Sequence, residues 1–544
     1  MDDTCFFSDA AHLIRFKNCC MNTLLLIIMK KKFYFNLLLL LACIFTMQAK
    51  SFAQSPFWQQ DSAVLNGDKA YSDLGTNLAL SRDGNTMVIG QNTDSGEVKI
   101  FMNQNGSWIQ KGNTILGKQS REGWGSQEVA ISGNGNIIAG LARANDNFAK
   151  DAGQARIYSY NATNDTWVQM GADLDGDTAR SELRTISLSK SGTRVAIGAS
   201  LGFGFKGKVR IFDYNSSSNS WVKNGELRGI KVGELFSFAM DMSDDGNRLV
   251  VGAYRHSDTL MWEGNVRVFE YNTTTSKWSQ IGTEIEGAAR MMALGYGVAI
   301  CGDGSRFSVS SQYQTVGFSS SAPNPDAYVQ VFDWNSGTND WVQIGSNINK
   351  ASTRNTTVFG RQMAFSRGGD TLAISMAQDY PDGKALIYYD SLGTWTQLGD
   401  TIDEKGVFGY QSNSLDLSAN GRVLAIGDPA NTTNGSSSGQ IRTFNWKTFS
   451  SNSSIKTTTT DITCYGAANG SATVSISNAT SYSILWSNQD TTETISNLTA
   501  GAYSVIVTTN TDTLYDTLLI TEPAIVYAII NEGATATICP GDSA

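Results

Sequence analysis

The chain has 544 residues, and its 53 glycines, 7 prolines and 17% charged residues favour many short strands joined by polar turns over a helical fold. Its formal net charge of −9, more negative once an N-terminal signal is removed, argues against nucleic acid as a partner. Of seven cysteines, only Cys301, Cys464 and Cys539 follow that segment. Their number and spacing predict neither a disulfide framework nor a zinc site.

Residues 29–53 have the pattern of a secretory signal peptide: a basic start, an apolar stretch, and a small-x-small site at Ser51-Phe52-Ala53. The apolar core is too short to span a bilayer, so the exported chain is not expected to span a membrane. The four residues ending at Cys43 resemble a lipobox, which leaves a lipoprotein as the alternative. Residues 1–28 are expected to be an upstream extension from a wrongly assigned start.

A Trp-x-x-x-Gly phrase recurs along the next 400 residues, roughly once per four predicted strands. Between the phrases, glycine-containing turns join pairs of apolar strands, as hairpins require. These turns lie at Asp83-Gly84, Asn134-Gly135, Ser191-Gly192, Asp245-Gly246, Asp303-Gly304, Gly368-Gly369 and Asn420-Gly421. Repeated four-stranded units predict an all-β fold, a seven-bladed β-propeller over residues 54–448.

Six Trp phrases accompany seven hairpins, and the missing phrase is at the N-terminus. We therefore expect the strand around Trp58 to be the outer strand of the last blade, closing the ring. Because the tryptophans recur at one structural position, they are predicted to pack between blades rather than stack on carbohydrate. They are Trp58, Trp108, Trp167, Trp221, Trp278, Trp341 and Trp395.

Motifs such as Val407-Phe408-Gly409, Val358-Phe359-Gly360 and Val195-Ala196-Ile197-Gly198 resemble FG-GAP-type propeller repeats. The resemblance implies the fold and no particular function. The Asp-x-Asp-x-Asp-Gly loop of the calcium-binding form does not occur in the sequence, so calcium is not implied. No metal site and no cofactor are expected.

A Ser/Thr-rich linker is predicted over residues 449–460, and residues 461–523 then resemble the SprB-type gliding-motility adhesin repeat. The resemblance is carried by Cys464-Tyr465-Gly466, Leu485-Trp486-Ser487, Ala500-Gly501-Ala502-Tyr503 and Thr521-Glu522-Pro523. It implies a small immunoglobulin-like sandwich in a Bacteroidota surface protein that uses the type IX secretion machinery. The family's second cysteine is missing near residues 510–513. Residues 524–544 resemble the opening of a further, truncated module.

Catalytic chemistry has little support in the sequence. His256 is the one histidine beyond the signal segment, which leaves no multi-histidine metal site, and we expect it to be a surface residue of a loop. Asp83 and Asp245 lie at hairpin turns and not at the Asp-box position of propeller hydrolases. The sequence therefore predicts that the protein is not an enzyme.

Loops between the second and third strands of the blades vary in length and content, and they are predicted to project from one face of the ring. Their candidate ligand-binding residues are Phe203, Phe205, Tyr254, Arg255, Trp262, Tyr313, Phe318 and Tyr380. These side chains suit a glycan or an extracellular protein. Equally, these loops could have no binding role and vary only because a rigid ring accommodates loops of different length.

The leading interpretation is a secreted or cell-surface binding or adhesion protein that uses this face as a non-catalytic platform. An extracellular polysaccharide-acting enzyme with carboxylates in the propeller funnel, or a structural spacer, are the alternatives. Convergent carboxylates of raised pKa in the channel mouth would favour the enzyme, and an uncharged channel would favour a binder or a spacer.

Overall fold

The computed structural model describes residues 57–312, 327–349, 358–377, 383–403, 414–447, 453–477, 479, 482–509 and 513–523. About half of these residues are in strands of antiparallel β-sheets, and a single short helical turn, α2 (Gly202–Phe205), is the only helix among them. None of their helices is long and apolar enough to cross a membrane. The predicted signal peptide and Tyr313, Phe318 and Tyr380 lie outside the described residues.

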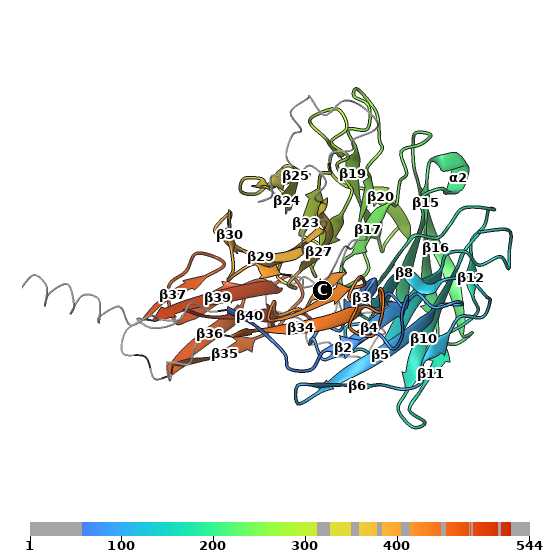
Figure 1. The fold of residues 1–544 in the computed structure, drawn as a ribbon. Helices are drawn as coiled ribbons and strands as arrows, with labels where there is room; N and C mark the ends of the chain where they lie inside the picture. Colours follow the sequence, from blue (N-terminus) through green and yellow to red (C-terminus); the bar gives the residue numbers. More distant parts are fainter. Residues whose placement is uncertain are drawn as a thin grey trace, which may run out of the picture. The chain divides into compact units, whose positions relative to one another are not determined.

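Each predicted repeat forms one sheet, and the sheets follow one another from blue β4 through green β19 to orange β34 (Figure 1). The first sheet has β3 (Asn77–Leu80), β4 (Thr86–Gln91), β5 (Glu97–Gln104), β6 (Ser107–Gln110) and β7 (Ile115–Leu116). The second has β8 (Trp124–Ile131), β9 (Ile137–Ala142), β10 (Gln154–Asn161), β11 (Thr166–Gln169) and β12 (Leu174–Asp175). The third has β13 (Thr185–Leu188), β14 (Arg194–Ala199), β15 (Lys208–Asn215) and β16 (Ser220–Arg228).

The later sheets repeat this order. The fourth has β17 (Ala239–Met242), β18 (Arg248–Ala253), β19 (Asn265–Asn272), β20 (Lys277–Gln280) and β21 (Ile285–Glu286). The fifth has β22 (Val298–Ile300), β23 (Arg306–Ser310), β24 (Tyr328–Asn335), β25 (Asp340–Gln343) and β26 (Ile348–Asn349). The sixth has β27 (Val358–Phe365), β28 (Thr371–Ala377), β29 (Lys384–Ser391), β30 (Thr394–Gln397) and β31 (Ile402–Asp403).

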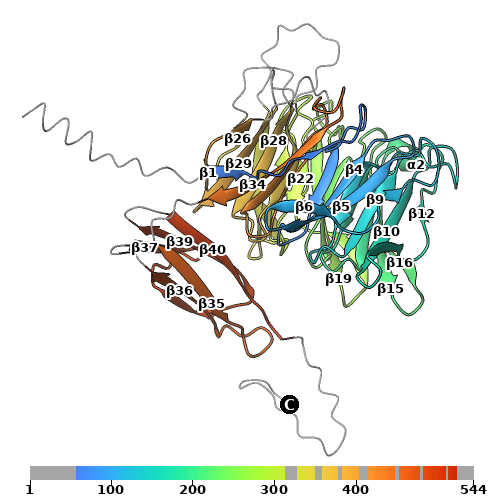
Figure 2. The ribbon, with the colours of Figure 1, turned by 60° about the horizontal axis from the view of Figure 1, so that its bottom comes forward.

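The last of these sheets joins the two ends of the segment. It contains β32 (Leu415–Leu417), β33 (Val423–Asp428) and β34 (Gln440–Lys447), with β1 (Phe57–Gln60) and β2 (Leu65–Asn66) paired to β34. Trp58 lies opposite Trp446 in the antiparallel register. Blue β1 lies along orange β34 (Figure 2), so the N-terminal strand completes the sheet at the other end of the segment, as the sequence predicts.

The first strands of the seven sheets are arranged in a closed cycle. β3, β8, β13, β17, β22, β27 and β32 each contact the next, and β32 contacts β3. The first hairpins are also joined by backbone hydrogen bonds of 2.8–3.0 Å, in which each N–H donates to a carbonyl of the following sheet. The bonds run from Arg82 to Gly133, Lys190, Asp244, Gly302, Arg367, Ala419 and back to Arg82.

The glycine of each first hairpin has a positive φ, between 67° and 76°, as such turns require. These residues are Gly84, Gly135, Gly192, Gly246, Gly304, Gly369 and Gly421. Apolar residues of the first three strands of each sheet pack against the next sheet and form the core. The result is a propeller-like arrangement of sheets around a central channel.

The repeated tryptophans lie between neighbouring sheets. Trp58, Trp108, Trp167, Trp221 and Trp341 are buried, whereas Trp278 and Trp395 are half-buried. The indole N–H of Trp167 donates to the carbonyl of Lys111, and that of Trp221 donates to the carbonyl of Met170 (2.8 Å each). Both carbonyls belong to the Trp phrase of the preceding sheet, so each indole bridges two sheets.

The C-terminal segment forms two three-stranded sheets that share one apolar core around Trp486. One has β35 (Ser454–Thr460), β36 (Gly470–Ser477) and β38 (Thr494–Leu498), and the other has β37 (Tyr482–Trp486), β39 (Gly501–Thr509) and β40 (Thr513–Ile520). The predicted linker over 449–460 is wrong for residues 454–460, because this threonine-rich, β-branched stretch pairs with β36. Cys464 is disulfide-bonded, although the number and spacing of the cysteines predicted no disulfide framework.

Candidate functional site

The central channel is lined by the first strands of the seven sheets and encloses about 190 Å³. Most lining residues are apolar, such as Leu78, Ile186 and Met240, but acidic residues interrupt them, and three of these lie on first strands of the sheets. They are Glu128 on β8, Asp241 on β17 and Asp416 on β32. The channel is therefore neither smooth nor uncharged.

Each channel carboxyl accepts a hydrogen bond from a backbone N–H of the next sheet. Glu128 Oε2 accepts from Ile186 (2.7 Å), and Asp416 Oδ2 accepts from Leu80 (2.7 Å). Asp241 Oδ2 accepts in the same way from Ile300 (3.0 Å). The first strand of a sheet is an edge strand with unpaired N–H groups, so these carboxyls connect sheets as well as line the channel.

Burial changes the protonation of these groups. It raises the pKa of Glu128 to about 8, to which the nearby Asp241 carboxyl contributes, while the Ile186 N–H opposes the change. The pKa values of Asp241 and Asp416 are also raised, again mainly by burial. Glu128 is therefore largely protonated at neutral pH, when it can donate as well as accept a hydrogen bond.

The channel opening on the side of the second-to-third-strand loops carries arginine and aromatic side chains. Arg184 and Arg361 line it beside Phe238 and Tyr296. The Arg184 guanidinium lies 4.0 Å from the centre of the Phe238 ring, and Arg361 Nη1 donates to the Tyr296 hydroxyl (3.3 Å). Burial and the charge of Arg361 lower the pKa of Arg184 to about 10. This opening suits anionic or polar ligands.

The opening at the hairpin end has a different character, because its charges are paired with one another. Asp244 forms ion pairs with Arg82 and with Arg367, whose Nε lies 3.1 Å from Asp244 Oδ2. Lys190 also lines this end of the channel. The pairing leaves fewer free charges here than at the Arg184 opening.

The predicted loop-face residues divide into exposed and enclosed groups. Phe205 is 60% exposed and Phe203 is 37% exposed, both in the α2 turn with positive φ. Arg255 and Trp262 are half-buried, and the Arg255 guanidinium lies 5.0 Å from the centre of the Trp262 ring. These four residues remain accessible on the β14–β15 and β18–β19 loops.

Tyr254 does not belong to the exposed set. It is 7% exposed and packs against Phe238, with ring centres 4.2 Å apart, and against Tyr296. The loop turns this aromatic side chain inward, where it supports the wall of the Arg184 opening. Tyr254 is therefore not exposed on the loop face, contrary to the prediction of a projecting side chain.

His256 is also buried, at 2% exposure, and the prediction of a surface histidine without a partner is wrong. Its Nδ1 lies 2.6 Å from Glu234 Oε2, and Arg267 Nη2 lies 3.0 Å from Glu234 Oε1. Glu234 precedes β17 and Arg267 is on β19, so tertiary packing brings the three together. Burial tends to raise the pKa of Glu234, but the His256 hydrogen bond and Arg267 outweigh it and lower that pKa.

Sequence reasoning missed Glu128, Asp241, Asp416 and the carboxyl partner of His256. For the channel residues a signal existed: an acidic side chain interrupts an otherwise apolar first strand, as in Ala239-Met240-Asp241-Met242. For Glu234 there was no local signal, because it lies 22 residues from His256.

Comparisons with known proteins match part of the C-terminal segment to a family model and find solved structures that resemble the chain at low identity. The SprB repeat family model matches residues 456–491, and this family is associated with cell-surface proteins. Among curated proteins, none matches the sequence.

Solved structures resemble the chain at low identity. One is the hydrazine synthase of Kuenenia stuttgartiensis (TM-score 0.44, 13% identity, 68% of this chain and 94% of that chain). Another is a mitotic checkpoint complex (TM-score 0.45, 14% identity, 72% and 92%). A third is the Cps50 (Swd1) β-propeller domain of Myceliophteria thermophila (TM-score 0.44, 11% identity, 71% and 100%).

Proposed function

We propose that the protein is a secreted or cell-surface binding or adhesion protein that works without catalysis. The observation that carries this proposal is the SprB repeat match at residues 456–491, which suggests an adhesin-like surface protein. The predicted signal peptide at residues 29–53 and the predicted use of type IX secretion agree with it.

In this proposal residues 54–448 are a seven-bladed propeller of the FG-GAP type, and the C-terminal sandwich is an immunoglobulin-like module. The cycle of seven hairpin hydrogen bonds and the pairing of β1 with β34 support the blade count. A ring held at every hairpin is rigid, which suits a platform that presents loops to a partner.

The proposed contact surface is the side that carries the β14–β15 and β18–β19 loops and the Arg184 opening. Phe203 and Phe205 offer exposed aromatic rings, and Arg255 with Trp262 adds a cation and an indole. Aromatic and arginine side chains dominate many interfaces and stack on sugar rings. A glycan or an extracellular protein is the proposed ligand.

A polysaccharide-acting enzyme is the second candidate, and the channel favours it by one observation. Glu128, Asp241 and Asp416 are carboxyls of raised pKa in one channel, as a general acid requires. An observation against catalysis is that each of these carboxyls already accepts a backbone hydrogen bond from the next sheet. A role in joining the sheets accounts for both properties, so we favour the binding protein.

The test is a screen of the purified chain against polysaccharides and extracellular matrix proteins, with hydrolysis of each polysaccharide assayed in parallel. For the ligand that binds, the double variant Phe203→Ala/Phe205→Ala should weaken affinity at least about tenfold. Val342→Ala, an exposed apolar residue on β25, is the matched control and should leave affinity unchanged. Polysaccharide turnover that Glu128→Gln abolishes would instead establish the enzyme.

A further inference from the structure

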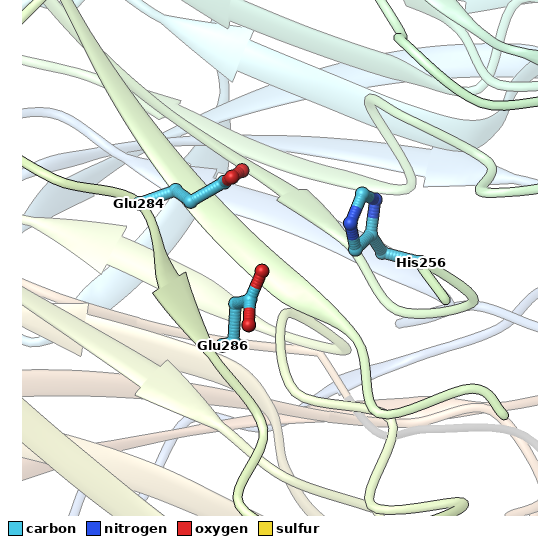
Figure 3. Close-up of side chains that lie close together, drawn as sticks. All are labelled: His256, Glu284 and Glu286. Carbon is cyan, nitrogen blue, oxygen red and sulfur yellow. The ribbon is translucent and has the colours of Figure 1, made fainter. Parts of the chain in front are cut away.

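Three side chains with metal-binding atoms come together beside the β18–β19 loop. His256 belongs to this loop, Glu286 belongs to β21, and Glu284 directly precedes that strand. One ligand atom of each lies within 4.8 Å of the others, and Figure 3 shows the imidazole facing the two carboxylates across one space. β21 pairs with β19, so the sheet itself fixes where the two glutamates stand relative to the loop.

The imidazole is held with one nitrogen available. A carboxylate only accepts hydrogen bonds, so the contact to Glu234 places the proton on His256 Nδ1. In the neutral ring Nε2 is then an unprotonated nitrogen, and no described residue hydrogen-bonds to it. A carboxylate on one imidazole nitrogen, orienting the other, is the arrangement found behind metal-bound histidines.

The loop that carries His256 is fixed by its own hydrogen bonds. The backbone N–H groups of Asp258 (2.6 Å), Thr259 (3.0 Å) and Leu260 (2.8 Å) all donate to the Glu263 carboxylate. The His256 carbonyl accepts from the N–H of Gly264 (3.1 Å). The imidazole is therefore presented by a preorganised loop, which lowers the entropic cost of binding an ion.

The two glutamates carry negative charge that nothing described neutralises by an ion pair. A carboxylate oxygen of Glu286 lies within 4.8 Å of one of Glu284, so two like charges stand close together. Asn265, which is fully buried, donates from Nδ2 to Glu284 Oε2 (2.8 Å), while its Oδ1 has no hydrogen-bond partner among the described residues. An orphaned carbonyl oxygen beside two like charges is an environment that a cation would stabilise.

We propose that His256 Nε2 and the carboxylates of Glu284 and Glu286 form a binding site for a divalent zinc-class cation. One imidazole nitrogen with two carboxylate oxygens suits Zn²⁺, whereas Ca²⁺ prefers an all-oxygen set. Ligand atoms around tetrahedral Zn²⁺ are about 3.4 Å apart, so binding requires the two glutamate side chains to move closer to the imidazole. The sequence predicted no metal, because the ligands share no motif.

The site is tested by titrating the purified chain with ZnCl₂ in a calorimeter and following the imidazole proton resonances by NMR. Only two histidines occur in the chain, so the His256 signals are readily assigned. We expect one Zn²⁺ per chain with a shift of the His256 resonances. His256→Asn should weaken Zn²⁺ binding at least about tenfold, and the positioning variant Glu234→Gln should weaken it about 10–100-fold.

His256→Asn is a conservative probe, because an asparagine, Asn145, occupies the equivalent position of the β9–β10 loop. The double variant Glu284→Gln/Glu286→Gln keeps side-chain size and should also abolish binding, while Glu226→Gln, on β16, is the matched control. Circular dichroism of each variant checks the fold. Wild-type protein that does not bind Zn²⁺, a folded His256→Asn variant that binds Zn²⁺ as tightly as wild type, or Ca²⁺ binding more tightly than Zn²⁺ would each overturn the proposal.

Discussion

The β9–β10 loop and the β18–β19 loop share one arrangement, here called the loop frame: a buried glutamate that is paired with an arginine and contacts a side chain of the loop. The two loops differ in that side chain. In the first, Asn145 Nδ2 donates to Glu122, which is paired with Arg156; in the second, His256 contacts Glu234, which is paired with Arg267. In both loops a glycine eight residues later donates its N–H to the carbonyl of the asparagine or histidine. The repeat thus supplies an internal comparison.

The acidic residues beside the two loop frames differ in whether they have ion-pair partners. In the second sheet Asp173 is paired with Lys118 (2.8 Å), and Asp175 accepts from Gln154 (2.6 Å). In the fourth sheet no described cation forms an ion pair with Glu284 or Glu286. The same loop frame can therefore stand beside acidic residues that are already paired, or beside acidic residues that are left to bind a ligand.

The largest effect is expected from the arginines of the two frames. Arg156 and Glu122 are fully buried, with N···O distances of 2.8 and 2.7 Å, so Arg156→Met leaves an unpaired buried carboxylate and should cost about 3–5 kcal/mol. Arg267→Met should cost less, because Arg267 makes one hydrogen bond of 3.0 Å to Glu234. Urea unfolding curves measure both.

Lys118→Met is the control for the arginine variants. Lys118 and Asp173 form an exposed pair, so its loss should cost under about 1 kcal/mol. If Arg156→Met were no more damaging than Lys118→Met, the buried network would not be what stabilises the β9–β10 loop.

The second effect concerns the carboxyls that the same two sheets place in the channel, Glu128 and Asp241. The folded pKa of Glu128 is about 8 against 4.5 for the ordinary group, so the folded protein binds more protons between these values. The contribution of Glu128 to the free energy of unfolding is then largest below pH 4.5. It falls as the pH rises to 8, by at most about 1.4 kcal/mol per pH unit.

Glu128→Gln should remove this slope and make the protein more stable than wild type above pH 8. Asp241→Asn should act in the same direction, because burial also raises the pKa of Asp241. Urea midpoints measured from pH 5 to pH 9 give the slopes. An unchanged slope in Glu128→Gln would show that Glu128 ionises freely in the folded protein.

The sequence predicted features that depend on local spacing. Turn glycines such as Gly192 and Gly246 have the expected positive φ, and β1 pairs with β34 because the Trp58 phrase completes an otherwise short repeat. The turn glycines agree with the repeating pattern. The pairing of β1 with β34 follows from a departure from it, because the last repeat has no Trp phrase of its own. Repetition makes the pattern legible even where individual strands are short.

The partners of the candidate functional residues could not be predicted in this way, because they are distant in sequence and meet only in the folded chain. Glu128 reaches Ile186, 58 residues away, and His256 reaches Glu234 in the segment before its own sheet. Tertiary packing, and not spacing along the chain, sets these distances. Tyr254 shows the same limit, since its inward turn depends on Phe238, just before β17 of its own sheet, and on Tyr296, just before β22 of the next sheet.

The smallest effect is expected from exchanging the two loop residues in metal-free buffer. His256→Asn should cost no more than about 1 kcal/mol, because Asn145 shows that an asparagine satisfies the buried glutamate of this frame. Asn145→His should be similarly mild and should not create a second Zn²⁺ site, since Asp173 and Asp175 are already engaged. Urea unfolding in the presence of a chelator, followed by calorimetric titration with ZnCl₂, separates stability from binding. A loss of several kcal/mol in His256→Asn would show that the imidazole belongs to the frame itself, and the two loops would then differ in construction as well as in the ligands they offer.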